Sequence, residues 1–411
     1  MKTNKKIVYS LLFSLICISA KAQVQHLPLD TILARIAVNP SLLSFNDKIN
    51  AEDAYVAGAK SLDPLKISAG QYQVNYQPKP YTGWFMIYGE QMFTNPAKLK
   101  AREAYLKGVS KVTAEDKNYV KNQLMAQARL SYYDRAVLEK KLSLLQGTQG
   151  LLEYMLKDAN IKLTYGKEKL NNIYKAKADL YQLDNIREQL KNEIVQKNIL
   201  LNTLMNRDKQ TEFTIDTNII IKGYETSPID TAAIAATRSD IKGISRNLEL
   251  QQLNANAEYS KRKPDFGVQA GHMIGLGSTP SQYTIMGVIT IPIVPWASKG
   301  YKANLKGIQY EQQELQQKRI DMLNQAEGQL AGLKADIGSK KRLLHNYSQN
   351  IIPAQQNNYR TALLAYEQNT GDLPSVLSGI KDLQTARMEN LDRLQELLQL
   401  QVAYERENEK Y

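Results

Sequence analysis

Apolar residues recur along much of the chain at the spacing of a packed helix. From residue 138 to 163 they follow one another at steps of three, four or seven. After a break the pattern resumes from 173 to 204, and it appears again from 380 to 402. This spacing is typical of a coiled-coil seam. No proline interrupts the first stretch, which predicts a helix from about 96 to 163, roughly 100 Å long at 1.5 Å per residue.

Four shorter segments alternate with period two instead, which predicts β-strands at about 65–77, 83–93, 265–274 and 282–293. The second segment is apolar at both sets of alternate positions, so the pattern does not say which of its faces points outward. Alternation over about ten residues is typical of transmembrane β-strands, although two soluble hairpins would give the same pattern. Aromatic residues near the strand ends would suit a membrane-interface girdle; they are Tyr76, Tyr81, Trp84, Tyr283 and Trp296.

These elements occur twice, at a spacing near 200 residues. Each half contains a short amphipathic helix, two strands, a very long helix, a tight break and a return helix. We therefore predict a first repeat at 23–207, a connecting segment at 208–237 and a second repeat at 238–411. The helix breaks fall at about 164–170 and 367–374. Matching landmarks include Pro64 with Pro264, Phe85 with Ile285, and Tyr165 with Tyr366.

The first 22 residues have the pattern of a secretory signal peptide. Three lysines precede an apolar stretch at 7–18, and Ala20-Lys21-Ala22 offers a cleavage site. Cys17, the only cysteine in the sequence, lies inside this segment. Ile16 before it does not suit lipoprotein processing. We therefore expect an exported mature chain without thiols or a lipid anchor.

The charge balance and the motifs exclude several classes of protein. The full sequence has a formal charge of +12, and removal of four signal-peptide lysines leaves 12 − 4 = +8. We interpret this excess as solvated lysines, because no basic run interleaved with aromatic residues indicates nucleic-acid binding. No phosphate loop, dinucleotide fingerprint or serine-hydrolase motif occurs. His26, His272 and His345 lack metal-ligand spacing. The sequence therefore predicts neither an enzyme nor a cofactor or metal site.

The number of strands constrains the assembly if the protein crosses a membrane. Outside the signal peptide, no stretch approaches the roughly 18 apolar residues of a spanning helix, so strands would have to cross. Open sheet edges are not tolerated in lipid, and membrane barrels have at least eight strands. Four strands per chain would therefore need a dimer of eight or a trimer of twelve, and the count does not choose between them.

Several short motifs accompany the repeat, and they are Asn39-Pro40-Ser41-Leu42, Arg238-Ser239-Asp240-Ile241, Pro264-Asp265-Phe266, Tyr165-Gly166, and Tyr366 with Gly371. In their order and spacing, the chain resembles the outer membrane efflux protein family, the TolC type, over almost the whole mature sequence. This resemblance implies a mixed fold of helices and transmembrane strands. A homotrimer would form a 12-stranded β-barrel in outer-membrane lipid, continued by a long periplasmic α-helical barrel, with segment 208–237 in an equatorial belt.

The resemblance also assigns a role to the two helix breaks. Tyr165, Gly166, Tyr366 and Gly371 would lie at periplasmic tips that dock on a periplasmic adaptor (membrane fusion) protein. That adaptor would connect the channel to an inner-membrane efflux pump, which supplies the energy for transport.

At the second tip the sequence departs from the family. Members often carry paired aspartates there, whereas this chain has Ser375-Val376-Leu377-Ser378, with Asp372 as the nearest acid. Three Asp372 carboxylates in a trimer would raise one another's pKa and attract cations. Asp372, Ser375 and Ser378 are therefore candidate gate residues. The alternative is that Asp372 is the N-cap of a helix starting near Pro374.

Segments 269–273 and 289–296 resemble the heavy-metal cation efflux branch of the family. We therefore expect a passive outer-membrane exit duct for heavy-metal cations or small toxic molecules. An outer-membrane duct for type I protein secretion is a second possibility. A soluble periplasmic coiled-coil adaptor or scaffold is a third, but an adaptor would have one helical hairpin rather than two and a small barrel domain between its helices.

Overall fold

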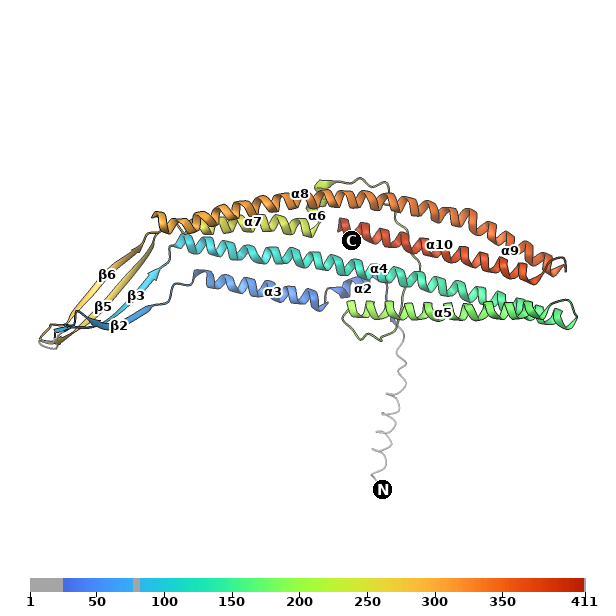
Figure 1. Ribbon diagram of the computed structural model, residues 1–411, viewed down its shortest axis with the longest axis horizontal. Coiled ribbons are helices and arrows are strands. Elements are labelled where there is room, and N and C mark those ends of the chain that lie inside the picture. Colours follow the sequence, from blue (N-terminus) through green and yellow to red (C-terminus); the bar gives the residue numbers. More distant parts are fainter. Residues whose placement is uncertain (1–24, 77–81, 410–411) are drawn as a thin grey trace, which may run out of the picture.

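The computed structural model describes residues 25–76 and 82–409. The expected signal peptide with Cys17, the turn at 77–80 and Tyr81 lie outside these residues. The molecule is elongated, with a β-sheet at one end, two helix turns at the other, and long helices between them (Figure 1). Among the described residues, no helix is both long and apolar enough to cross a membrane.

The first half of the chain contains the longest helix. Two of its helices begin in the same way: the side chains of Asn39 and Asn95 each accept a hydrogen bond of 3.0 Å from the backbone N–H two residues later, and a proline follows each asparagine. The elements are β1 (Gln25–His26), α2 (Leu29–Ile36), α3 (Pro40–Val56), the 3₁₀ helix η1 (Ala57–Lys60), β2 (Lys66–Tyr72), β3 (Thr82–Phe93), α4 (Pro96–Thr164) and α5 (Leu170–Leu204).

The second half has the same order of helix, strand pair, long helix and return helix. Its long helix contains a π-helical turn, η2 (Tyr347–Ile351), just before Pro353. Proline lacks the N–H of the regular ladder, which explains an irregular turn at this place. The other elements are β4 (Phe213–Thr214), α6 (Thr231–Thr237), α7 (Ser239–Ser260), β5 (Asp265–Gly277), β6 (Gln282–Thr290), α8 (Pro295–Asn346), α9 (Ile352–Glu367) and α10 (Leu373–Asn408).

The larger sheet has four antiparallel strands in the order β2-β3-β5-β6, and it is open. Two strands are shorter than the sequence predicted. Strand β2 ends at Tyr72 because Gln73 takes a positive φ of 51°, which interrupts the alternation. Strand β6 ends at Thr290, shortly before Pro292. Strand β5 instead continues to Gly277, beyond the predicted end at 274.

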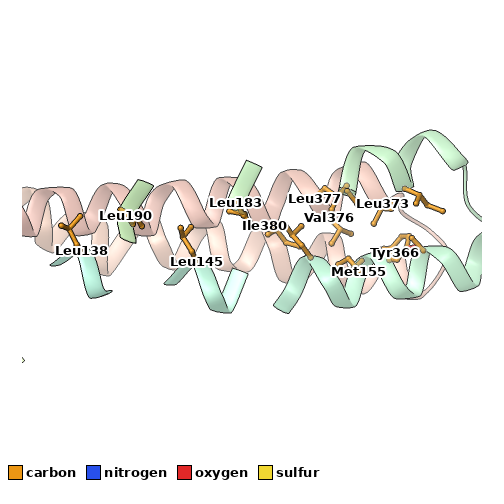
Figure 2. Close-up of a cluster of buried hydrophobic side chains, with 14 residues drawn as sticks. Leu138, Leu145, Met155, Leu183, Leu190, Tyr366, Leu373, Val376, Leu377 and Ile380 are labelled. Atoms are coloured by element: carbon orange, nitrogen blue, oxygen red, sulfur yellow. The ribbon is translucent and has the colours of Figure 1, made fainter. Parts of the chain in front are cut away.

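Much of the helical stripes found in the sequence forms a core along the helices next to the turns, whereas Leu201 and Leu204 of α5 belong to a second core. Leu138 and Leu145 of α4 face Leu183 and Leu190 of α5, and all four side chains are buried. Figure 2 shows that this row continues to Ile380 and its neighbours on α10, toward the helix turns. The coiled-coil spacing therefore corresponds to a real packing seam.

The connecting segment 208–237 is fastened to the helices at the middle of the molecule. Strand β4 pairs in parallel with β1. Further along, Lys222 Nζ and Tyr224 Oη donate to Glu405 on α10 at 2.7 and 2.5 Å, and Arg129 of α4 pairs with the same carboxylate at 2.5 Å. Burial acts to raise the pKa of Glu405, but these donors outweigh it and the pKa is lowered.

A single aspartate joins the sheet to the helices. The Asp265 carboxylate, at the start of β5, accepts hydrogen bonds from the Asn95 backbone N–H at 2.8 Å and from Lys98 Nζ at 2.5 Å. Asn95 also donates through its side chain to the Pro264 carbonyl at 3.1 Å. The start of α4 is thereby fixed to the start of the third strand, which belongs to the other half of the chain.

Candidate functional site

The first helix turn connects α4 to α5 and is closed by a glycine. The Gly166 N–H donates to Leu163 O at 2.9 Å, and the Lys167 N–H donates to Lys162 O at 2.9 Å. With Gly166 at φ 69°, this is a Schellman motif, which satisfies the last carbonyls of the helix. Tyr165 is the C-cap residue, and its side chain is 75% exposed.

The second helix turn connects α9 to α10 and uses the same hydrogen bonds with a different residue. The Asn369 N–H donates to Tyr366 O at 3.2 Å, and the Thr370 N–H donates to Ala365 O at 2.9 Å. Asn369 takes the positive φ, 56°. The structural counterpart of Gly166 is therefore Asn369, and Gly371, the glycine that the sequence placed at this turn, has another role.

Gly371 is required for a different reason, which is close packing. A Cβ at this position would lie 3.0 Å from the Ala365 Cβ and 3.2 Å from the Tyr366 backbone nitrogen. The Gly371 N–H also donates to Ala365 O at 2.9 Å. The absent side chain lets the loop fold tightly over the end of α9.

Tyr366 is buried, in contrast to Tyr165. Only 3% of it is exposed, and its ring belongs to the core that includes Met155 and Leu373. Burial raises the pKa of its phenol, and the carboxylates of Asp158 and Glu168 raise it further. Tyr366 therefore shapes the turn from within and offers no surface for direct contact with a partner.

A lysine holds the two turns together. Lys162 Nζ donates to the Tyr366 carbonyl at 3.0 Å and lies 3.5 Å from the centre of the Tyr366 ring. Asp158, one helical turn earlier, pairs with Lys162 at 3.5 Å. The role of Lys162 was not predicted from the sequence. Its four-residue spacing from Asp158 was visible, but the carbonyl that it binds lies 204 residues away.

One pocket between the two turns collects most of the expected site residues. Gly166, Tyr366, Gly371 and Asp372 all line it, together with Glu168. Tyr165 points to solvent outside the pocket. The expected gate serines, Ser375 and Ser378, are likewise not among the residues that line it.

Asp372 is the N-cap residue of α10. Its carboxylate accepts hydrogen bonds from the Ser375 backbone N–H at 3.0 Å and from the Ser375 hydroxyl at 2.5 Å. These hydrogen bonds lower the pKa of Asp372. A ring of three aspartates would shift the pKa in the opposite direction. Within one chain, Asp372 thus acts as a helix cap. A gate formed by three Asp372 side chains concerns the trimer and remains a proposal.

The strand register separates an apolar face of the sheet from a more polar one, which mixes charged residues with apolar ones such as Met86 and Met92. The apolar face carries no charged residue, whereas the other carries Lys66, Glu90 and Asp265. This register shows which residues of β3 share a face with the apolar residues of the other strands, which the sequence pattern of this segment did not decide. The apolar face consists of Ile67, Ala69, Gln71, Gly83, Phe85, Ile87, Gly89, Gln91, Phe93, Phe266, Val268, Ala270, His272, Ile274, Leu276, Tyr283, Ile285, Gly287 and Ile289.

The expected girdle residues lie in different places on the sheet. Trp84 lies on the polar face, opposite Tyr72 and Gly275, and its Nε1 donates to the Pro280 carbonyl at 2.9 Å. Tyr76 falls beyond the end of β2. Tyr283 remains on the apolar face, and Trp296 is exposed at the start of α8. In the described part of the chain, no group of three His, Cys, Asp or Glu side chains could hold a metal ion.

No protein-family model matches the sequence, and no curated protein matches it. Solved structures do match. CusC, described for transmembrane channel formation, superposes with a TM-score of 0.75 at 15% identity, over 92% of this chain and 91% of that one. The chain has the fold of an outer-membrane channel protein. VceC of Vibrio cholerae gives a TM-score of 0.72 at 14% identity, over 92% and 95%. The open state of the Neisseria gonorrhoeae channel MtrE gives 0.70 at 15% identity, over 92% and 88%.

Within this channel fold, the sheet and the two helix turns lie at opposite ends of the molecule (Figure 1). The sheet presents an apolar face without charges, and the turns present a polar pocket lined by backbone-capped helix ends.

Proposed function

We propose that this protein is the outer-membrane channel of a tripartite efflux system. It would act as a passive exit duct for heavy-metal cations or small toxic molecules. The observation that carries the proposal is the uncharged apolar face across all four strands, on a chain whose fold matches outer-membrane channels. Three chains would close twelve strands with this face toward lipid, which removes every open edge.

The helix turns would dock on a periplasmic adaptor protein that leads to an inner-membrane pump. Their position at the end farthest from the sheet supports this role (Figure 1). Exposed Tyr165 is the side chain best placed to touch the adaptor. Gly166, Gly371 and buried Tyr366 would instead fix the shape of the docking surface. Asp372 would line the narrow end of the duct in the trimer.

The assembly is tested by purifying the protein from outer membranes, measuring its mass in detergent and recording its conductance in a planar bilayer. We expect a trimer that conducts ions. A soluble monomer without conductance would show that the strands are ordinary hairpins and would favour a periplasmic scaffold.

The docking role is tested with Tyr165→Ser in cells that export a toxic metal cation. We expect export to fall while the amount of trimer in the outer membrane stays unchanged. The matched control is Tyr310→Ser on α8, which changes a tyrosine of similar exposure far from the turns. Unchanged export by the Tyr165 variant, or equal loss by the control, would count against docking through the first turn.

A further inference from the structure

Exposed cations gather where the sheet meets the helices. At this joint β3 leads into α4, β6 leads into α8, and α7 leads into β5 (Figure 1). In the part of the chain that the structure describes, six exposed cations at the joint form no ion pair with a carboxylate. We call them the junction cations; they are Lys100, Arg102, Arg262, Lys263, Lys299 and Lys302.

Other cations at the same joint already form ion pairs with carboxylates. Lys98 pairs with Asp265 at 2.5 Å, Lys60 pairs with Glu103 at 2.9 Å, and Lys261 pairs with Glu258 at 2.5 Å. The junction cations are therefore additional to these ion pairs, although the Arg262 guanidinium lies 3.9 Å from the centre of the Tyr259 ring. Their surplus needs an explanation other than the stability of this joint.

The junction cations border the apolar face of the sheet. That face ends at Phe93, Phe266 and Ile289, within about ten residues of the nearest junction cation along the chain. The start of α8 shows this arrangement most clearly. The side chain of Trp296 is 79% exposed, and Lys299 and Lys302 follow it at steps of three residues along the helix. An apolar surface followed by tryptophan and then lysine is typical of a membrane–water interface.

At the opposite end of the sheet, the residues that the structure describes carry no charge, and Lys79 of the turn at 77–80 lies outside them. The described residues there, 72–76, 82–84 and 275–283, include no Lys, Arg, Asp or Glu. Among the described residues of the sheet and its two ends, the unpaired cations thus lie on the side of the apolar face that adjoins the helices. An anionic partner at that level of the membrane would explain the asymmetry.

We propose that the junction cations bind the headgroups of anionic phospholipids in the leaflet next to the helical body. This inference rests on the proposed function, because only a membrane-inserted sheet would place these residues at a lipid surface. Long lysine and arginine side chains can keep their stems on apolar surface while the charged ends reach phosphate oxygens. Each cation near an anionic lipid surface strengthens binding by about fivefold.

The test measures which phospholipids the purified protein retains. The protein is reconstituted with equal amounts of phosphatidylglycerol and phosphatidylethanolamine, released into detergent and examined by native mass spectrometry. We expect strong enrichment of phosphatidylglycerol, which weakens as ionic strength rises. The triple variant Lys263→Gln, Lys299→Gln, Lys302→Gln should reduce this enrichment by about tenfold or more.

A matched triple variant controls for total charge. Lys157→Gln, Lys318→Gln and Lys381→Gln remove three exposed lysines from the helical body and should leave the enrichment unchanged. Equal retention of the two lipids by the unchanged protein, or an equal loss in the control variant, would overturn the inference.

Conductance measurements on the same preparations distinguish a failure of the lipid-binding proposal from a failure of the proposed channel function. A conducting trimer without lipid preference would overturn the lipid site and leave the channel function standing. A monomer that neither conducts nor inserts would overturn both, because the junction cations would then not lie at a membrane surface.

Discussion

The two helix turns perform the same geometric task with different residues. Both close the end of a long helix with a Schellman motif, but one uses Gly166 and the other uses Asn369 for the left-handed position. The tyrosines near them also differ, since Tyr165 is exposed and Tyr366 is buried. Similar landmarks in the sequence can therefore have different physical roles, and only one of these turns offers an aromatic side chain to a partner.

The largest expected effect comes from removing the buried tyrosine. Tyr366→Ala would leave a cavity beside Met155 and Leu373, so we expect local stability of the turns to fall by about 3–5 kcal/mol. The matched change Tyr165→Ala removes an exposed ring and should alter stability by no more than about 0.5 kcal/mol. Hydrogen exchange of the turn amides measures both values.

A third variant shows which part of Tyr366 matters. Tyr366→Phe keeps the ring that Lys162 contacts and removes only the buried hydroxyl, so it should retain most of the stability. Similar losses in Tyr165→Ala and Tyr366→Ala would contradict the contrast between the two turns.

The next largest effect is expected from substitutions at Gly166 and Asn369, the residues with a left-handed backbone conformation. Gly166→Ala places a Cβ at φ 69° and should reduce stability of the first turn by about 1–2 kcal/mol. Asn369→Gly should cost little, because glycine adopts this conformation readily. Rates of proteolysis at the turns compare the two variants. Equal sensitivity would mean that the helix ends do not depend on these backbone conformations.

The long helices and the outline of the strands could be predicted from the sequence. Helical spacing is local, so the stripe from Leu138 to Leu163 identified α4 before its partners were known. Its packing against α5 and α10 is what the structure adds. The channel type was also expected, from the order and spacing of several weak motifs rather than from any one of them, and the fold agrees with it.

What could not be predicted depends on elements far apart in the sequence. Trp84 was assigned to an outward girdle, but the register with β5 places it on the polar face. Tyr366 was matched with Tyr165 by spacing, yet its burial results from α4 and α10 packing around it. In both cases the local pattern was consistent with two orientations, and the tertiary partner selected one.

The smallest expected effect concerns Asp372, and it separates capping from gating. Asp372→Ala removes the cap of α10 and should reduce stability by about 1 kcal/mol, whereas Asp372→Ser should restore most of the cap. Serine carries no charge, however, so a gate made of three Asp372 carboxylates would lose cation selectivity in this variant. A capped, stable Asp372→Ser channel with unchanged selectivity would mean that the residue acts only as a cap.

The pH dependence of the second turn's stability also distinguishes a capping role of Asp372 from a gating role. The Ser375 hydrogen bonds lower the pKa of Asp372 in the folded chain. The stabilisation is therefore fully present above the ordinary aspartate pKa of about 4 and is lost as pH falls through the lower, folded value. Hydrogen exchange should show the second turn opening more easily in this acidic range, while Asp372→Ser removes the dependence. If the trimer instead raises the pKa of Asp372, the stability of the turn will change above pH 4, which would favour a ring of interacting carboxylates over an isolated helix cap.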